Sequence, residues 1–456
     1  MRNSRSYAIV GAGHRSAMYV DALVGPHAPD GRLVAVCDSN LGRATRLAAI
    51  ARQAGVEVPT FGADDFDAML ARHKPDRLII TTPDNTHAHY IVRALDAGCD
   101  VVTEKPLTID AESCRRILDA RARTGRSILV CFNYRYSPVR TLLKQVLMSG
   151  IIGTVQSVAF EWLLDTHHGA DYFRRWHRRR ENSGGLFVHK ATHHFDLLNW
   201  WLGAVPRRVT ARGSLEFYRP EVADALGLQD RGQRCHGCPA FARCGFRIDI
   251  AKTAPLDTLY LANELYDGYF RDRCVFSSEI DIEDTMNALL EYDGIAVNYS
   301  LTAYCPREGY RVVFNGTRGR IEHSNVERAY VQPDGRIVRP ALPEEDSIRV
   351  QPHFGRTYDL VLPRGVGLHA GGDVVMLDAL FRGGGDDPFG RVADERAGVA
   401  SSLVGIAANR SMTANRPVAL DELVPDFPEA ARPRSVPMWV TFDAARYPFL
   451  EGARIV

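Results

Sequence analysis

One short segment concentrates side chains that can move a proton. Within eight residues the chain carries five ionisable groups: His189, Lys190, His193, His194 and Asp196. A histidine titrates near neutral pH and can accept a proton from a hydroxyl group. A single helical histidine is more often a core residue with satisfied hydrogen bonds, but that explanation does not extend easily to all five groups. The segment is therefore predicted to hold acid–base chemistry.

The same segment is predicted to begin a helix. Apolar side chains follow at helical spacing: Phe195, Leu198, Trp201 and Leu202. Spacings of three and four residues place His189 beside His193, and His193 beside Asp196. We therefore expect the acid–base groups to cluster at the start of this helix.

A further lysine stands at the end of an apolar run. Residues 101–106 read Val-Val-Thr-Glu-Lys-Pro, and Pro106 biases Lys105 away from helical backbone. The carboxyl ends of parallel strands face the ligand crevice. Lys105 is therefore placed to reach both a cofactor ribose and a substrate hydroxyl, and its alternative role is that of a surface lysine in a turn.

A glycine turn near the start of the chain has the features of a phosphate site. Gly11 and Gly13 follow the apolar run at residues 7–10 and precede a helical pattern. Such a turn lets backbone N–H groups receive a pyrophosphate at a helix N-terminus. The third position of the motif is Ser16 rather than glycine, so the motif is imperfect. Asp38 ends the next strand, where a carboxylate accepts hydrogen bonds from a ribose diol and repels a ribose phosphate. NAD is therefore predicted over NADP, with a helix N-cap as the alternative role of Asp38.

These residues need a scaffold that aligns strand ends. Over residues 1–131, apolar strands alternate with amphipathic helices, which predicts an α/β domain with a doubly wound parallel sheet, a Rossmann NAD-binding domain. Residues 132–430 contain successive hairpins, one of them turning at Asp293-Gly294. They predict a second α/β domain with a mostly antiparallel sheet, for substrate binding and homo-oligomer formation. Residues 431–456 are expected to form a C-terminal tail.

The combined motifs resemble those of the glucose–fructose oxidoreductase and inositol dehydrogenase family (Gfo/Idh/MocA) over nearly the whole chain. The matching positions are Gly11 and Gly13, Thr82-Pro83 with His87, Glu104-Lys105-Pro106, residues 132–136, Gly184-Gly185 and His193 to Asp196. The resemblance implies a Rossmann domain followed by a mostly antiparallel α/β domain. It also implies that Lys105 and His193 lie beside the nicotinamide.

The expected cofactor-binding set combines the glycine turn with these motifs. It comprises Gly11, Gly13, His14, Arg15, Ser16, Asp38, Thr82, Pro83, Asn85, His87, Glu104 and Lys105. The expected catalytic residues are Lys105, His193, His189 and Lys190.

One departure from the family pattern affects the expected substrate. Many relatives carry an aspartate four residues before the histidine that matches His193, and a glycine two residues before it. This chain has His189 and Ala191 there, with Lys190 between them. A cation-rich pocket replaces a carboxylate, which favours an anionic or otherwise unusual sugar.

Arginines precede this segment and reinforce that expectation. Residues 172–180 include Arg174, Arg175 and Arg178, and a solvated surface is the usual role of such a run. We expect one or two of them to line the pocket, because a guanidinium donates paired hydrogen bonds to a carboxylate or sulfonate. The predicted substrate-binding residues are Tyr134, Arg135, Asp165, His168, Arg174, Arg178, Lys190 and His194.

Four cysteines mark an insertion near residues 230–275. Cys235 and Cys238 have the spacing of a zinc half-site, and Cys244 and Cys274 supply two further thiols. A structural zinc is predicted, with an iron–sulfur cluster and unligated thiols as the alternatives.

Composition narrows the function further. The formal net charge is +1, which gives no global reason to bind nucleic acid or an anionic membrane. No run of about 18 uncharged apolar residues and no signal-peptide core occurs, so a cytoplasmic enzyme with a small-molecule sugar or glycoside partner is expected.

Three functions remain open from the sequence. The first is NAD-dependent oxidation of a ring hydroxyl of a sugar, glycoside or polyol. The second is a redox-neutral NAD-dependent glycosidase, which oxidises a ring hydroxyl, eliminates the aglycone, adds water and returns the hydride. The third is a non-enzymatic NAD-linked sensor, which the acid–base cluster argues against.

Overall fold

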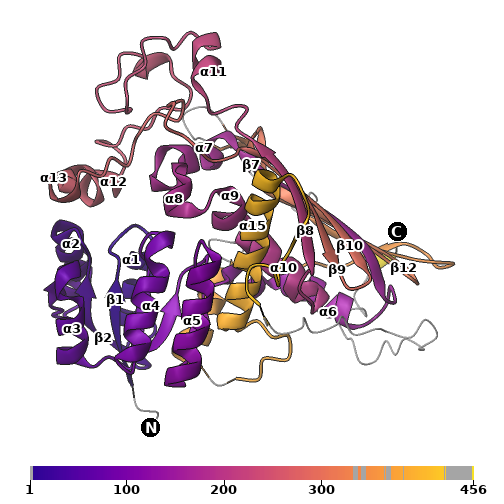
Figure 1. Ribbon diagram of the computed structural model, residues 1–456, viewed down its shortest axis with the longest axis horizontal. Coiled ribbons are helices and arrows are strands. Elements are labelled where there is room, and N and C mark those ends of the chain that lie inside the picture. Colours follow the sequence, from indigo (N-terminus) through magenta and orange to yellow (C-terminus); the bar gives the residue numbers. More distant parts are fainter. Residues whose placement is uncertain are drawn as a thin grey trace.

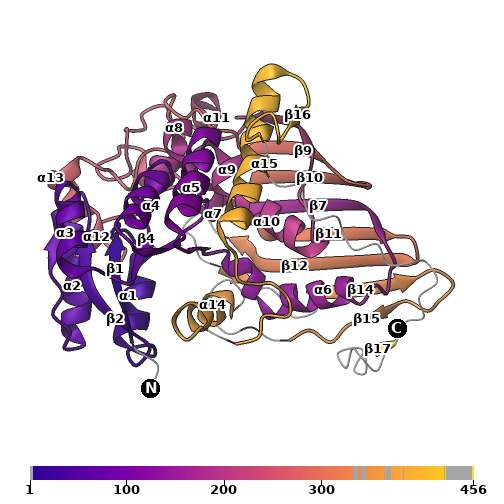
Figure 2. The same cartoon turned by 60° about the horizontal axis from the view of Figure 1, so that its bottom comes forward.

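Two β-sheets organise the chain in the computed structural model (Figures 1 and 2). The structure describes residues 4–331, 337–339, 346–363, 365, 371–383, 385–425, 427 and 454–455. Most of the expected tail at 431–456 lies outside these residues. No helix in the described ranges combines the length and apolarity that a membrane crossing requires.

The first sheet is parallel and doubly wound, as predicted. Its strands are β1 (Arg5–Val10), β2 (Gly31–Cys37), β3 (Thr60–Phe61), β4 (Arg77–Ile80), β5 (Asp100–Thr103) and β6 (Ile128–Val130). They pair in the order β3-β2-β1-β4-β5-β6, the dinucleotide-binding order that reverses between β1 and β4. The reversal opens a crevice at the carboxyl ends of these two strands.

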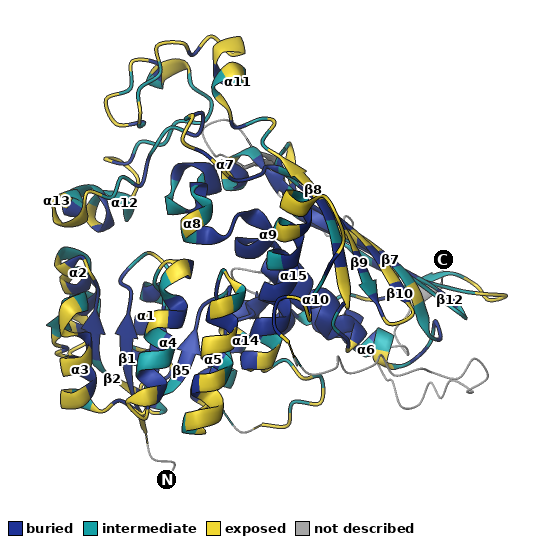
Figure 3. Ribbon diagram, in the orientation of Figure 1, coloured by how far each residue is buried: buried dark blue, intermediate teal, exposed yellow. Residues whose placement is uncertain are grey.

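Five helices flank the first sheet. They are α1 (Ser16–Val24), α2 (Leu41–Gln53), α3 (Phe66–His73), α4 (His87–Asp96) and α5 (Ala111–Thr124). Side-chain caps fix two of their starts: Asn40 accepts from the Arg43 N–H, and Asp110 accepts from the Ser113 N–H. Figure 3 shows the apolar strands buried beneath these half-exposed helices.

In the described part of the chain the second sheet has 11 strands and is mostly antiparallel, again as predicted. Its strands are β7 (Val155–Asp165), β8 (Arg208–Ser214), β9 (Thr285–Tyr292), β10 (Ile295–Cys305), β11 (Arg307–Gly316), β12 (Gly319–Val331), β13 (Ile337–Arg339), β14 (Ser347–Pro352), β15 (Tyr358–Asp359), β16 (Val418–Ala419) and β17 (Arg454–Ile455). The β9–β10 hairpin turns at Asp293-Gly294, where Gly294 has a φ of 77°. One central pair, β7 with β10, is parallel.

The remaining helices follow the first sheet in the chain. They are α6 (Pro138–Met148), α7 (Thr166–Arg174), α8 (Arg180–Ser183), α9 (Leu186–His189), α10 (Ala191–Leu202), α11 (Pro220–Ala225), α12 (Leu256–Leu259), α13 (Glu264–Asp267), α14 (Gly372–Phe381) and α15 (Glu395–Ala414). Three of them, α11, α12 and α13, lie in the insertion between β8 and β9. Late in the chain, α14 returns to the first domain, where Phe381 packs edge-on against Tyr7 at 5.1 Å. The first core is therefore completed by a segment far away in sequence.

The segment with the acid–base groups differs from the single amphipathic helix expected. It forms α9 and α10 with Lys190 between them, and every residue of α10 is buried (Figure 3). The reason is packing on several sides, because α10 contacts α15, α9 and α6. Asp196 pairs with Arg135, with N–O distances of 2.5 and 2.8 Å, rather than lying free beside His193.

Candidate active site

A cavity of about 710 Å³ lies where the carboxyl ends of the first sheet face the second domain. Of the predicted residues, those lining it are Gly11, Gly13, His14, Arg15, Asp38, Thr82, Pro83, His87, Glu104, Lys105, Tyr134, His168, His189, Lys190 and His193. Fold and motifs thus converge on one place, so this cavity is the candidate active site.

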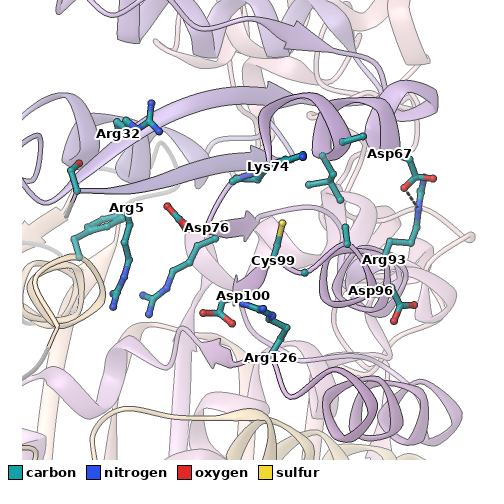
Figure 4. A pocket seen from close by; sticks show the side chains of 18 of the residues that line it. Arg5, Arg32, Asp67, Lys74, Asp76, Arg93, Asp96, Cys99, Asp100 and Arg126 are labelled. Carbon is teal, nitrogen blue, oxygen red and sulfur yellow. Dashed lines mark hydrogen bonds and ion pairs between the residues drawn. The ribbon is translucent and has the colours of Figure 1, made fainter. Parts of the chain in front are cut away.

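A wider hollow of about 1500 Å³ opens at the opposite edge of the first sheet (Figure 4). It is lined by residues at the starts of strands, among them Arg5 and Asp100, and by charges that neutralise one another, such as the Arg93–Asp67 pair at 2.7 Å. Ligands of doubly wound folds bind at the carboxyl ends of the strands, so this hollow is not the candidate site.

The glycine turn fits a dinucleotide. Gly11 has a φ of 94°, and a Cβ there would collide with the backbone of Thr81, so only glycine suits the position. Around Gly13 a Cβ would meet only the Tyr260 hydroxyl at 3.7 Å, which leaves its backbone open to a ligand. Asp38 accepts hydrogen bonds from the N–H groups of Ala12 at 2.5 Å and Asn40 at 2.7 Å. Its carboxylate thereby holds the turn while facing the cavity.

Charged groups support the helix that follows the turn. Arg15 donates to Glu104 at 2.6 Å and to Asp373 of α14 at 3.0 Å, and the Tyr19 hydroxyl also donates to Glu104. Burial opposes ionisation of Glu104, but Arg15 and these hydrogen bonds outweigh it and lower its pKa. Ser16 does not line the cavity; its hydroxyl donates to the Gly13 carbonyl at 2.6 Å and so shapes the turn.

His87 joins the two strand-end loops. Its ring nitrogens face the carbonyl oxygens of Pro106 at 2.8 Å and Thr82 at 3.0 Å, and its burial lowers its pKa. The ring therefore ties the loop after β4 to the loop that carries Lys105. Asn85 lies outside the cavity lining, where it donates to Asn182 at 3.3 Å.

Lys105 is held by backbone. Its Nζ donates to the His189 carbonyl oxygen at 3.1 Å, which connects the first domain to α9. Burial lowers its pKa to about 8, although Asp84 and Glu104 nearby act in the opposite direction. A lysine with that pKa can change its protonation state near the working pH of an enzyme.

His189 meets a carboxylate that the sequence analysis did not identify. Asp84 Oδ2 lies 2.5 Å from His189 Nδ1, and both side chains are buried. Burial raises the pKa of Asp84 and lowers that of His189, with Lys105 and Arg175 also lowering the latter. The pair can share one proton, so the carboxylate that the family pattern places at position 189 is supplied here from the loop after β4.

Lys190 and His193 meet at Tyr134. The Lys190 Nζ donates to the Tyr134 hydroxyl at 3.1 Å, and the His193 ring stacks on the Tyr134 ring at 4.2 Å. Among the described residues, Lys190 forms no ion pair with a carboxylate. A buried ammonium beside a phenol thus faces the cavity together with an imidazole.

A second set of side chains that can carry protons lies at the cavity. His168 Nδ1 lies 2.7 Å from the buried Glu308 carboxylate, and its Nε2 lies 3.0 Å from the Tyr172 hydroxyl. Burial raises the pKa of Tyr172 to about 12, while Lys190 opposes the rise. Glu308, His168 and Tyr172 therefore form a hydrogen-bonded row that ends at the cavity.

Five predicted substrate residues lie outside the cavity lining. Arg135 pairs with Asp196, and the Asp165 carboxylate caps α7 by accepting from the N–H groups of His167 and His168 at 2.8 Å. His194 Nδ1 lies 2.7 Å from the Tyr299 hydroxyl, and its ring stacks on Trp162. These side chains shape the domain around the site.

Three arginines of the run at residues 172–180 lie in different surroundings. Arg174 donates to the Phe246 carbonyl oxygen at 3.0 Å, and Arg178 donates to Glu279 at 3.1 Å, so both hold the insertion. Arg175 lines the cavity instead. Its guanidinium lies 3.6 Å from the Asp171 carboxylate. The expectation that one arginine of this run reaches the cavity thus fits Arg175, not Arg174 or Arg178.

Several lining residues were missed by the sequence analysis. They are Asp84, Tyr172, Trp176, His177, Tyr260, Asp267 and Tyr269. Asp84 stood within the Thr82-to-His87 motif and could have been found there. Tyr260, Asp267 and Tyr269 belong to the insertion, and no local pattern announces that an insertion folds back over a cavity.

The described residues contain no group of three or more His, Cys, Asp or Glu side chains arranged to hold a single metal ion. The predicted zinc is therefore not shown. No metal is assigned to the candidate active site.

Family models match both domains of the chain. The NAD-binding Rossmann fold of the Gfo/Idh/MocA oxidoreductase family matches residues 5–132, and the C-terminal alpha/beta domain of that family matches residues 144–420. Together they span most of the sequence and both sheets.

Individual relatives agree with the models. The oxidoreductase YteT of Bacillus subtilis (strain 168) is 40% identical over 377 residues, which cover 80% of this chain and 86% of YteT. Inositol 2-dehydrogenase of Rhizobium meliloti (strain 1021) is 33% identical over 209 residues, 46% of this chain and 58% of that enzyme. A levoglucosan dehydrogenase solved in complex with NADH superposes with a TM-score of 0.62 at 17% identity, covering 92% of this chain and 99% of that one. With its glycine turn, its Lys105 loop and both domains matched, this chain belongs to the Gfo/Idh/MocA family of NAD-binding oxidoreductases.

Proposed function

We propose that this protein uses NAD to oxidise a ring hydroxyl of a sugar, glycoside or polyol. One observation carries the proposal: Lys105, Lys190, His193 and Tyr134 line the same cavity as the glycine turn and Asp38. Acid–base groups and a nucleotide-binding turn in one cavity are what hydride-transfer chemistry requires. The inositol dehydrogenase relative acts on a polyol, which supports this substrate class.

The cofactor would be held by the first domain. The backbone of Gly11 to Arg15 would receive the pyrophosphate, and Asp38 would accept from the ribose hydroxyls, which favours NAD over NADP. When bound, the nicotinamide supplies the hydride acceptor. The protein's own groups supply orientation and proton transfer.

The side chains then have separate roles. Lys105, as an ammonium, would hold the substrate oxygen by a hydrogen bond, because its Nζ lies at the cavity and is fixed by the His189 carbonyl. His193 would accept the hydroxyl proton, since its ring lines the cavity and is fixed by stacking on Tyr134. The Asp84–His189 pair would keep this wall in place and buffer one proton.

We further propose an anionic substrate. Lys190 is buried and its hydrogen-bonding partner is the neutral Tyr134 hydroxyl. A buried ammonium without a carboxylate partner is costly, and an anionic ligand would compensate it. A uronate or sulfonate group is the anion that a sugar would bring.

The redox-neutral glycosidase is the second candidate, and one observation favours it. Glu308, His168 and Tyr172 form a second proton-carrying row at the cavity, in addition to Lys105 and His193. Elimination and hydration need proton transfers beyond those of simple oxidation. Simple dehydrogenation leaves this row without a chemical task.

One assay separates the two candidates. The enzyme is incubated with NAD and matched neutral, uronic and sulfonated glycosides, and NADH absorbance and released aglycone are recorded together. Stoichiometric NADH with an intact glycosidic bond supports the dehydrogenase. Aglycone release with catalytic NAD and no net NADH supports the glycosidase, and Tyr172→Phe should then lose more elimination activity than oxidation. Neither product from any substrate class would contradict both.

A further inference from the structure

Four cysteines far from the candidate active site surround one small cavity. The cavity has a volume of about 20 Å³, and its lining includes Cys235, Cys238, Cys244 and Cys274. All four are reduced, and phenylalanines close the space around them, among them Phe241 and Phe276. The fold thus brings together cysteines that lie up to 39 residues apart in the sequence.

Hydrogen-bond donors lie beside two of the four sulfurs. The Gly232 N–H donates to Cys238 Sγ at 3.2 Å. The guanidinium of Arg174 lies 3.9 Å from Cys235 Sγ. Donors around sulfur, within an apolar shell, are the usual outer environment of thiolates that bind metal.

We propose that Cys235, Cys238, Cys244 and Cys274 together ligate one thiolate metal centre. Four thiolates suit either a zinc ion or a [4Fe–4S] cluster. The four cysteines line one cavity, although the described residues contain no group of three or more His, Cys, Asp or Glu side chains that could hold a metal ion as they stand. A cluster binds each of its irons to a separate thiolate and does not require three sulfurs to meet at one ion, so we favour a cluster over zinc.

The cysteines of the proposed centre flank one segment of the insertion on both sides. Cys235 and Cys274 flank an isolated antiparallel bridge between Arg234 and Arg273. There the Cys235 N–H donates to the Asp272 carbonyl and the Cys274 N–H donates to the Gln233 carbonyl, each at 2.8 Å. Between them runs the segment at residues 245–271, which we call the flap. A metal held by all four thiols would close the flap into a loop and remove conformational freedom from it.

The flap reaches the cofactor side of the active-site cavity. The Tyr260 hydroxyl accepts from the His14 N–H at 3.1 Å, and Asp267 pairs with Arg43 at 2.5 Å. Asn40 donates to the Asn263 carbonyl at 2.9 Å. Figures 1 and 2 show α12 and α13 extending from the second domain toward α2. The metal centre therefore holds the flap against the first domain, a consequence that rests on the proposed use of NAD.

Metal analysis tests the centre directly. Protein purified without oxygen is assayed for iron, acid-labile sulfide and zinc per chain, and for absorbance near 400 nm. We expect about four irons and four sulfides with the broad band of a cluster. One zinc per chain without iron also supports the four-thiolate centre and identifies its metal. Protein that holds neither metal, even after anaerobic reconstitution with iron and sulfide or with zinc, would overturn the proposal.

Cysteine variants test which thiols bind the metal, and NAD titration tests whether the metal affects NAD binding. Cys274→Ser should lose the metal, whereas Cys305→Ser, a half-buried thiol outside this cavity, should retain it. If Cys274→Ser does not fold, the metal content of the wild-type chain still decides the proposal. Calorimetric titration with NAD of the metal-loaded and chelator-stripped protein should show about three- to tenfold weaker binding after stripping. Metal bound with unchanged NAD affinity would overturn the flap's role but not the centre.

Discussion

At the residue scale, the candidate site is distinguished by its buried ionisable side chains. Lys105 and Lys190 bring two lysine side chains into one cavity, and Asp84 Oδ2 lies 2.5 Å from His189 Nδ1 beside them. A neutral Asp84–His189 pair would avoid the cost of two isolated ions, whereas a buried lysine relaxes that cost by a lowered pKa or by a bound anion. Two predictions follow from these lysines.

The first prediction concerns the pH dependence of Lys105. Its pKa is about 8, so an ammonium that holds the substrate oxygen loses its proton as the pH rises through that value. The kcat/KM of oxidation should therefore fall above pH 8, and Lys105→Ala should lose at least about 100-fold in kcat. Lys105→Arg keeps a charge that does not titrate, so its residual activity should show no decline in this range.

The pH dependence of protein stability provides a second test of the lowered pKa of Lys105. The folded-state pKa lies below the ordinary value of 10.5, so the unfolded chain binds more protons between pH 8 and 10.5 and stability contributed by this group rises across that window. Lys105→Met should therefore be more stable than the wild type at pH 7, by on the order of 3 kcal/mol, with the difference vanishing above pH 10.5. Equal melting temperatures at pH 7 would argue against a buried ammonium here.

The second prediction concerns Lys190 and substrate charge. Lys190→Met should raise the KM for a uronic glycoside by about 10- to 100-fold, the value of a charge-assisted hydrogen bond, and change the KM for the neutral glycoside little. Lys190→Arg preserves the cation and serves as the matched control. Equal losses on both substrates would mean that Lys190 positions Tyr134 rather than binding an anion.

At the element scale, two close approaches position the site. The flap lies on the first domain through Asp267, and α15 lies against α9 because Gly405 has no side chain. A Cβ at Gly405 would overlap the Phe187 carbonyl oxygen, two residues before His189. Neither approach involves a group that does chemistry, yet both determine where such groups lie.

The third prediction tests the flap. Asp267→Ala removes the ion pair with Arg43, which is largely shielded from solvent, and should weaken NAD binding by about three- to tenfold. Leu265→Ala is the control, because Leu265 lies on the same helix and is 99% exposed. Titration calorimetry of both variants measures the effect; a loss of the same size in the control would point to unfolding of α13 instead.

The fourth prediction tests the packing of α15. Gly405→Ala should destabilise the protein by about 1–3 kcal/mol, since backbone must move to admit the methyl group. It should also lower activity by displacing the turn that carries His189. Arg410→Ala, on the exposed face of α15, should change neither quantity. Denaturant unfolding and turnover are measured on both, and an unaffected Gly405→Ala enzyme would show that α9 tolerates the shift.

At the scale of the whole molecule, the candidate active site belongs to neither domain alone. The glycine turn, Asp84 and Lys105 come from the first domain, and His189, Lys190 and His193 come from the second. Helix α14 joins the two domains by packing into the first core. A ligand in the cavity therefore contacts both domains, and its binding free energy adds to the stability of the assembled chain. The expected homo-oligomer stays a prediction that light scattering in solution can test.

The fifth prediction uses this coupling. NAD at about 100 times its Kd should stabilise the protein by about 2.7 kcal/mol and raise its melting temperature. The same concentration of NADP should raise it less, because the added phosphate would meet the Asp38 carboxylate. Differential scanning calorimetry compares the two cofactors. Equal shifts would mean that Asp38 serves the glycine turn alone.

The sequence by itself determined the parts whose signals are local. Alternation of apolar strands and helices predicted the first sheet, and Asp293-Gly294 predicted a hairpin of the second, because period and turn chemistry are properties of neighbouring residues. Gly11 and Lys105 were identified for the same reason. Those motifs sit at strand ends, which every parallel sheet brings to one edge.

Only the tertiary structure decided the long-range partners. Asp84 meets His189 across 105 residues, and Tyr260 meets His14 across 246. No spacing rule relates such pairs, because their contact depends on how two domains and an insertion pack. The arginine run shows this limit: three similar side chains lie within five residues, but α7 ends at Arg174 and Arg175 has extended backbone. Arg175 lines the cavity, while Arg174 and Arg178 hold the insertion. Whether a side chain is buried depends on the residues that pack against it, and those residues come from distant parts of the chain.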